Sequence, residues 1–182
     1  MLVVMGIDPG FASTGFGVVR LAGGSMSALD AGVIEAPPGE PAAKRLARLH
    51  AGLEQLMSWH QPAAVALEEV YFGRNVRSAI AVGQARGVAM LAVAQHATDC
   101  FDYTPQAVKM AVCGSGSASK KQVQRMVGTL LALGRAPDSD HAADALAVAI
   151  CHASRMRPAA AGVGSRAETA LGEPARREAW AR

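Results

Sequence analysis

The sequence has few aromatic residues, although it is rich in hydrophobic ones. Phe, Trp and Tyr together make up 4% of the 182 residues, whereas hydrophobic residues as a whole make up 51%. The core must therefore be built from Val, Leu, Ile and Ala, in close packing of helices on a sheet. A chain of this length is sufficient for one domain with a substantial core and for little more.

Cysteine is also scarce, and its spacing excludes the common metal-binding patterns. Cys100, Cys113 and Cys151 are odd in number and share no metal-type spacing. We expect reduced, mostly buried thiols in a cytosolic protein. A zinc site made of Cys151, His152 and His141 is conceivable, but the chain offers no CxxC-like anchor for it.

The chain is not expected to contain a membrane-spanning segment. The stretch 78–95 comes closest, and Gln84 and Arg86 interrupt it. The N-terminus has no basic region or cleavage site of a signal peptide, and it begins instead with the apolar run of a strand. We therefore expect a cytoplasmic protein without membrane partners.

The net charge of +3 is unevenly distributed along the chain. Residues 1–70 contain four Lys or Arg and seven Asp or Glu, whereas residues 71–135 contain eight basic and only two acidic residues. Such a basic zone is the usual footprint of binding to a phosphate backbone. It also suits a solvated helix surface, and charge alone does not separate the two interpretations.

Hydrophobic periodicity and turn residues predict a mixed α/β fold. Three strands in a meander are followed by alternating helices and strands, so the first and fourth strands can lie side by side and parallel. We expect one domain over 1–156 and a disordered tail over 157–182. The expected strands are 2–8, 14–21, 28–35, 63–69 and 100–103, and the expected helices are 42–59, 75–95, one that opens at Thr104-Pro105, 120–133 and 139–154.

Acidic residues and a histidine stand where buried elements meet loops. Asp8 follows the first apolar run, Glu68 and Glu69 close the fourth strand, and His141 and Asp144 begin the last helix. A charge at the end of a buried strand is costly unless something compensates for it, and a bound cation would do so. Oxygen ligands favour Mg²⁺ or Mn²⁺. Since Glu68 and Glu69 lie on opposite faces of a strand, only one can enter the site, and composition does not choose.

Short segments in a fixed order resemble the RuvC-type Holliday junction resolvases over about residues 1–155. They are GIDPG at 6–10, TGFGVV at 14–19, LEEVYF at 67–72, GQARGV at 83–88, QAVK at 106–109, GSGSA at 114–118 and AADALA at 142–147. The resemblance implies an RNase H-like mixed five-stranded sheet flanked by helices. It also implies a homodimer that resolves four-way DNA junctions by paired Mg²⁺-dependent nicks in recombination and repair, and cooperation with a branch-migration helicase complex of the RuvA and RuvB type.

The resemblance also assigns roles to individual residues. It selects Glu68 over Glu69 and makes Asp8, Glu68 and Asp144 metal-binding acids, so two Mg²⁺ or Mn²⁺ ions per site are expected. In the last helix His141 replaces the first acid of the family's D-x-x-D pattern, and we expect it to bind the second metal with Asp144. The residues expected to contact DNA are Tyr71, Arg74, Arg77, Lys109, Lys120 and Lys121.

Several other interpretations remain open at this point. Asp8 before Pro-Gly suits a turn, His141 suits a structural histidine, and Tyr71 suits a packed aromatic side chain. Asp138 and Asp140 fit the start of a helix better than a metal site. The Gly-rich opening also suits ATPases of the actin and sugar-kinase type, and a junction-binding protein without nuclease activity is a further alternative.

Overall fold

The computed structural model describes residues 1–69, 76–134, 137 and 139–156. Tyr71 and Arg74, two of the residues expected to contact DNA, lie outside this range, as does the tail 157–182. The strands are β1 (Leu2–Asp8), β2 (Ser13–Ala22), β3 (Ser25–Glu35), β4 (Ala64–Glu68) and β5 (Asp99–Tyr103). The helices are α1 (Ala42–His60), α2 (Val76–Gln95), α3 (Pro105–Cys113), α4 (Lys120–Leu130) and α5 (Asp140–Arg155).

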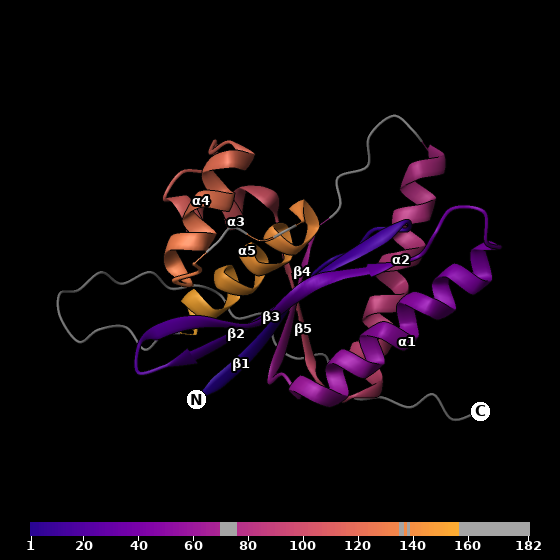
Figure 1. The fold of residues 1–182 in the computed structure, drawn as a ribbon, viewed down its shortest axis with the longest axis horizontal. Helices are drawn as coiled ribbons and strands as arrows, with labels where there is room; N and C mark the ends of the chain where they lie inside the picture. The colour runs from indigo at the N-terminus through magenta and orange to yellow at the C-terminus, as the bar shows by residue number, and fades with distance from the viewer. Residues whose placement is uncertain (70–75, 135–136, 138, 157–182) are drawn as a thin grey trace, which may run out of the picture.

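The five strands form one mixed sheet in the order β3-β2-β1-β4-β5 (Figure 1). Strands β1 and β2 are antiparallel, whereas β1 and β4 are parallel, with Ile7 opposite Leu67. Asp8 and Glu68 follow this pair, so they end neighbouring strands at the same end of the sheet. This confirms the expected fold and the predicted pairing of the first and fourth strands.

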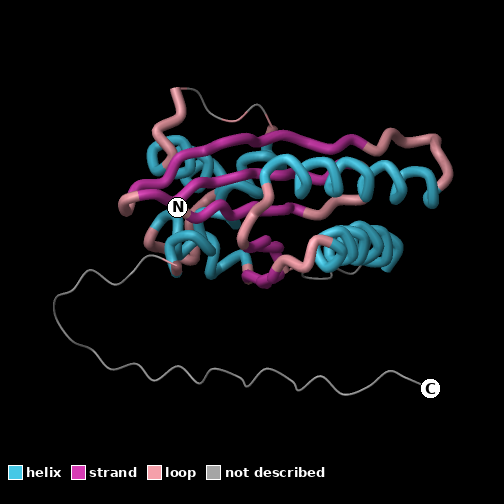
Figure 2. Tube along the Cα trace, turned by 90° about the horizontal axis from the view of Figure 1, so that it is seen from below, coloured by secondary structure: helices cyan, strands magenta, loops and turns pink. Residues whose placement is uncertain are grey.

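The two faces of the sheet are covered by different helices, as Figures 1 and 2 show. One core contains Ala66 of β4 together with residues of α3, α4 and α5, and the other contains Leu67 together with residues of α1 and α2. Because side chains alternate along a strand, Glu68 shares the face of Ala66 and is directed toward α5. Glu69, one residue further, falls on the opposite face.

Helix α5 lies unusually close to the sheet because glycines face it. A Cβ on Gly6 would overlap the carbonyl oxygen of Ala145, one on Gly15 would overlap that of His141, and one on Gly17 would lie 2.7 Å from the backbone nitrogen of Leu146. No larger residue fits between the sheet and the helix at these positions. The glycines thus bring the first turns of α5 to the strand ends where Asp8 and Glu68 lie.

Capping residues set the start of the helices next to the site. Thr104 caps α3 by accepting a hydrogen bond from the Ala107 backbone, with Pro105 at the first position. Ser119 caps α4 in a capping box with Gln122. Helix α4 ends at Leu130, three residues earlier than expected, because Ala132 has a φ of 50° that no α-helix accommodates.

Helix α2 and the cysteines differ from the expectations. By length and composition alone α2 is a helix that could cross a membrane, whereas no apolar run of that length was expected. The same composition occurs in core helices of soluble proteins, and Ala85 and Ala89 of α2 are buried against α1 and the sheet.

The prediction of mostly buried thiols was wrong for Cys100, which is exposed on the edge strand β5, although all three cysteines are free.

Candidate active site

Asp8, at the end of the central strand β1, meets His141 although the two residues are 133 positions apart in the chain. The Nδ1 of His141 lies 2.7 Å from Oδ2 of Asp8 and donates a hydrogen bond to that carboxylate. Ser139 caps α5 by accepting a hydrogen bond from the backbone of His141, which fixes the first turn of the helix. The fold therefore places His141 beside the first predicted acid.

Glu68 faces the same place from β4. Its pKa is raised to about 7, first by burial and then by repulsion from Asp8 and Asp144, while Lys109 and Lys120 oppose the shift. These influences require all four groups to lie near the Glu68 carboxyl group. Three acids from β1, β4 and α5 thus converge in a partly buried environment, where their repulsion is only partly compensated.

Asp144 carries the third carboxylate, one turn into α5 from Asp140. Lys120 Nζ donates a hydrogen bond to Oδ2 of Asp144 at 3.0 Å. Burial raises the pKa of Asp144, and the Lys120 ammonium opposes this effect. Within the described residues no three of the His and acid groups surround one point as metal ligands do, and Lys120 and His141 occupy oxygens of Asp144 and Asp8.

A cavity of about 270 Å³ opens beside Glu68 and Asp144. Lys109 of α3 and Lys120 of α4 line it together with Pro105 and the core residues Val108, Val123 and Ala147. Both carboxylates and ammonium groups therefore line the cavity. Such a cavity suits a site that binds a cation and a phosphate together.

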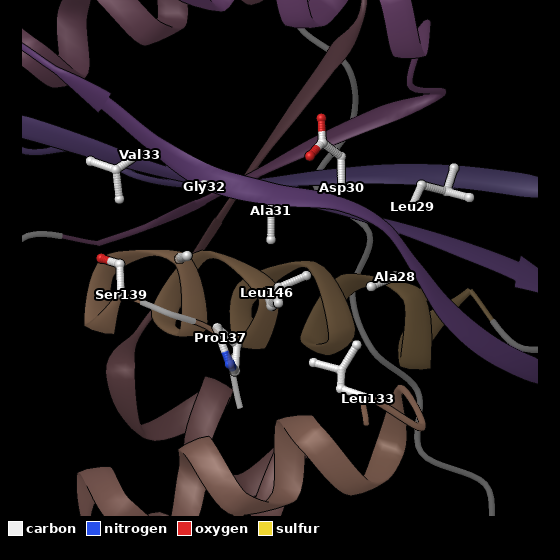
Figure 3. Close-up of a pocket in the computed structure, with 11 residues that line it drawn as sticks. Ala28, Leu29, Asp30, Ala31, Gly32, Val33, Leu133, Pro137, Ser139 and Leu146 are labelled. Carbon is white, nitrogen blue, oxygen red and sulfur yellow. The ribbon is translucent and has the colours of Figure 1, made fainter. Parts of the chain in front are cut away.

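A larger cavity, of about 510 Å³, lies between β3 and α5 and is a poorer candidate (Figure 3). Its lining includes one carboxylate, that of Asp30, which Figure 3 shows pointing away from α5. The Oδ2 of Asp30 lies 3.0 Å from Nε2 of His60 on α1, on the other side of the sheet. Among the described residues, the larger cavity therefore lacks the group of acids that metal-assisted chemistry needs.

Two of the expected DNA contacts are not among the residues that line the cavity beside Glu68 and Asp144. Lys121 is exposed next to Lys120 on α4, and Arg77 is exposed in the first turn of α2. Neither side chain has a described ion pair that would compete for a phosphate. Their contact with DNA stays a prediction, as it does for Tyr71 and Arg74.

Sequence reasoning did not find the residue that holds the backbone at Glu68. Arg86 of α2 donates one hydrogen bond to the Glu68 carbonyl oxygen, at 3.0 Å, and another to Oδ1 of Asp102, at 2.6 Å. In the sequence, Arg86 was distinguished only by its place in the basic zone 71–135 and in the GQARGV segment. The link connects α2 to the end of β4.

A second arginine holds the loop that follows Asp8. Arg45 of α1 donates hydrogen bonds to the carbonyl oxygens of Ala36 and Phe11, and its guanidinium lies 4.3 Å from the centre of the Phe11 ring. Thr14 closes the turn by donating to the Gly10 carbonyl oxygen. Nothing in the local sequence around Arg45 predicts these contacts.

The conceivable zinc site is not formed. His141 stands in the first turn of α5, whereas Cys151 and His152 lie ten residues further, about 15 Å along the helix. His152 is buried, and its Nδ1 lies 2.7 Å from the hydroxyl of Tyr103. Burial, aided by the charge of Arg155, lowers the pKa of His152, so it is a neutral core residue.

The raised pKa of Glu68 predicts a pH dependence of stability without metal. Between 4.5 and about 7 the folded protein binds more protons at this group than the unfolded chain does, so stability should fall as pH rises through this window. Glu68→Gln should reduce this fall and raise the melting temperature at pH 8. Melting temperatures of the parent and the variant, measured in EDTA at pH 5 and pH 8, give the size of this pH dependence. Glu69→Gln, on the other face, is the control and should behave like the parent, and equal pH profiles for Glu68→Gln and the parent would contradict the prediction.

Comparisons with known proteins identify the family of the chain. The family model "Crossover junction endodeoxyribonuclease RuvC" matches residues 4–152. Curated RuvC proteins from Pelotomaculum thermopropionicum and Rubrobacter xylanophilus are each 50% identical to this chain, over 152 and 163 residues respectively. These matches cover 84% and 89% of this chain and 93% and 91% of the relatives.

Solved structures show the same fold. The structure of Thermus thermophilus RuvC in complex with Holliday junction substrate has a TM-score of 0.82 and 39% identity, and the match covers 85% of this chain and 94% of that one. The yeast mitochondrial Holliday junction resolvase Ydc2, with a TM-score of 0.60 and 12% identity over 83% of this chain and 78% of that one, shares the fold. The chain therefore belongs to the family of RuvC crossover junction endodeoxyribonucleases, as the sequence resemblance predicted.

Proposed function

We propose that the chain resolves four-way DNA junctions by paired, metal-dependent nicks. The observation that carries this proposal is the convergence of Asp8, Glu68 and Asp144, with Glu68 and Asp144 lining one cavity together with Lys109 and Lys120. Phosphodiester hydrolysis needs an activated water and compensation of charge on the scissile phosphate, and an acid cluster facing ammonium groups supports both. The Thermus thermophilus relative was solved with Holliday junction substrate, which supports the choice of DNA.

The residues present fit a hard divalent cation. The pKa of Glu68 is raised by burial and then by the charges of Asp8 and Asp144, as expected of a cluster with more negative charge than its lysines compensate. Asp8 and Glu68 would hold one ion, and Asp144 with His141 would hold another. Bound Mg²⁺ or Mn²⁺ would supply a metal-activated water and polarise the phosphate.

The chain's own residues perform the remaining steps. Lys109 and Lys120 line the cavity together with Glu68 and Asp144, so they would neutralise phosphate oxygens next to the acids. His141 holds Asp8 in one orientation through their 2.7 Å hydrogen bond. Asp144 is partly buried, which limits access of water to its carboxylate. Arg77 and Lys121, both exposed, would contact the phosphates of the duplex arms, as would Arg74, and Tyr71 would unstack bases at the junction centre.

The proposal is tested with a synthetic four-way junction and a linear duplex of the same sequence. Labelled strands should show nicks at symmetric positions of two opposing strands in the junction, only when Mg²⁺ or Mn²⁺ is present. The linear duplex should stay intact. Binding of the junction without any nick, over a range of junction sequences and with either metal, would support the alternative of a junction-binding protein without nuclease activity.

We also propose that two copies act together through α2. A stripe of apolar and small residues runs along the exposed side of this helix at helical spacing: Val76, Ile80, Gly83, Gly87 and Leu91. Val76, Ile80 and Leu91 are 70%, 59% and 52% exposed, and a Cβ on either glycine would meet nothing within 4 Å. A second α2 could approach closely at the glycines, and a two-fold dimer presents two equivalent sites to the two strands of a junction.

Gly87→Leu should weaken this dimer, because the added side chain would separate the two helices. Sedimentation at micromolar concentration should show a dimer for the parent and a larger monomer fraction for the variant. Gly128→Leu is the matched control, since Gly128 lies on α4 and also faces open space. A parent that sediments as a monomer with and without junction DNA would contradict the proposal of paired cutting.

His141 should set the choice of metal. An imidazole in place of a carboxylate removes one negative charge and favours Mn²⁺ over Mg²⁺. We expect faster nicking in Mn²⁺ for the parent, a gain in Mg²⁺ for His141→Asp, and a loss of about tenfold in both metals for His141→Ala. His60→Ala, which removes an imidazole from α1, is the control. If His141→Ala cuts as fast as the parent in both metals, His141 has only a structural role.

The cellular setting is proposed from the family resemblance. We propose action in the cytoplasm together with a branch-migration helicase complex of the RuvA and RuvB type. Pull-down of such a complex with junction-bound protein would test it, and failure to detect an interaction with the assembled complex on a junction would contradict it.

A further inference from the structure

The ammonium group of Lys120 lies between two carboxylates of α5. Its Nζ is 3.0 Å from Oδ2 of Asp144 and 3.2 Å from Oδ2 of Asp140. The two acids are four residues apart and therefore share one side of the helix. Only Asp144 belongs to the acid cluster around Glu68, so Asp140 gives the ammonium a second partner next to the proposed metal site.

Asp140 is itself held in place by α4. Nε2 of Gln124 donates a hydrogen bond of 2.7 Å to Oδ1 of Asp140. Gln124 and Lys120 are also four residues apart, so one side of α4 uses both carboxylate oxygens of Asp140. The side chains of Lys120 and Asp140 are 51% and 66% exposed, and such exposed pairs contribute little to stability. The arrangement is better explained by orientation of the ammonium group.

We infer that Asp140 is a positioning residue that keeps the Lys120 ammonium at the active site when Asp144 binds a metal. The inference rests on the proposed metal site. A cation that binds Oδ2 of Asp144 displaces the ammonium from that oxygen. With Asp140 3.2 Å away, the displaced ammonium keeps a carboxylate partner and remains within the cavity that Lys109 also lines. Without Asp140, displacement leaves Lys120 with no acidic partner on α5, which makes metal binding less favourable.

Asp140 also has a simpler explanation. It stands in the first turn of α5 next to the Ser139 cap, where an acid interacts favourably with the helix dipole. It also adds negative charge near a cation site. Both effects are independent of Lys120, whereas positioning requires it. A double-mutant cycle between the two residues therefore separates the explanations.

The experiment measures Mn²⁺ affinity by titration calorimetry for the parent, Asp140→Asn, Lys120→Met and the double variant. We expect Lys120→Met to bind Mn²⁺ about fivefold more tightly, since the competing ammonium is gone, and Asp140→Asn to bind it about fivefold more weakly. In the Lys120→Met background, Asp140→Asn should change the affinity by less than about twofold. Asp140→Glu should restore much of the parent affinity, and thermal unfolding verifies that each variant is folded.

The possible failures are distinguishable. If Asp140→Asn weakens Mn²⁺ binding equally with and without Lys120, Asp140 acts through its charge alone and the inference is wrong. If it has no effect in the parent background, the inference is also wrong. If the parent binds no Mn²⁺, or if Asp144→Asn does not weaken its Mn²⁺ binding, the proposed metal site itself fails. Nicking rates at saturating Mn²⁺ give a second readout, in which Asp140→Asn should be slower than Asp140→Glu.

Discussion

Asp8→Asn is expected to lower the rate of junction nicking by about a thousandfold or more, which corresponds to about 4 kcal/mol of transition-state stabilisation. Asp8 ends β1 at the point where β4 and α5 converge, and its carboxylate would hold a metal ion together with Glu68. Glu68→Gln should have a similar effect. The amide replacements keep the shape of the side chains but remove the charge that holds the metal.

Binding of the junction should survive both changes. The acids repel the phosphate backbone, so loss of one should leave affinity unchanged or increase it. Nicking rates and gel-shift affinity measured in parallel, at one stated salt concentration, test this. Asp99→Asn, which removes an exposed carboxylate at the start of β5, is the control for the change in net charge. A folded Asp8→Asn protein that loses both cutting and binding would contradict the assignment of Asp8 to the metal.

Gly15→Ala should damage both stability and cutting, although it adds one methyl group. Gly15 lies opposite Asp8 on β2, and a Cβ there would overlap the carbonyl oxygen of His141 and lie 2.9 Å from its Cβ. The first turn of α5 would have to move away from the sheet. We expect a loss of about 1–3 kcal/mol in the free energy of unfolding. We also expect nicking to be slower by about a hundredfold, since small displacements of catalytic groups have effects of this size.

The control is Gly128→Ala, a helical glycine with open space around it. That change should leave nicking unaltered and stabilise α4 by up to about 1 kcal/mol, because alanine favours helix. Denaturant unfolding and nicking should be measured for both variants. Parent-like stability and parent-like nicking for Gly15→Ala would show that the close approach of α5 to β2 does not position His141.

Much of the fold could be predicted because each element has its own local signal. Alternation and apolar runs predicted the five strands, and Thr104-Pro105 predicted the start of α3. The sequence could not predict that α4 ends at Leu130, since alanine at position 132 gives no sign of the positive φ that it adopts. It also gave no sign that Cys100 would be exposed, because position at a sheet edge is a property of the whole topology.

The acids of the site could be predicted in part. Asp8 and Glu68 follow apolar strands, and the family resemblance favours Glu68 over Glu69. The alternation of side chains along β4 gives the physical reason, since it turns Glu68 toward α5. The contacts of Arg86 with the Glu68 backbone and of Asp140 with Lys120 could not be predicted. They join elements that are distant in the chain, and such polar contacts have no sequence periodicity.

The most direct test of the metal site is anomalous scattering from Mn²⁺ in crystals of the protein with a four-way junction. We predict a peak shared by the carboxylates of Asp8 and Glu68, and a second one beside Asp144 and His141, with Lys120 displaced from Asp144. Glu68→Gln crystals should lose the first peak. Absence of Mn²⁺ at Asp8, in crystals of protein that nicks the same junction in solution, would contradict the central claim that these acids bind the catalytic metal.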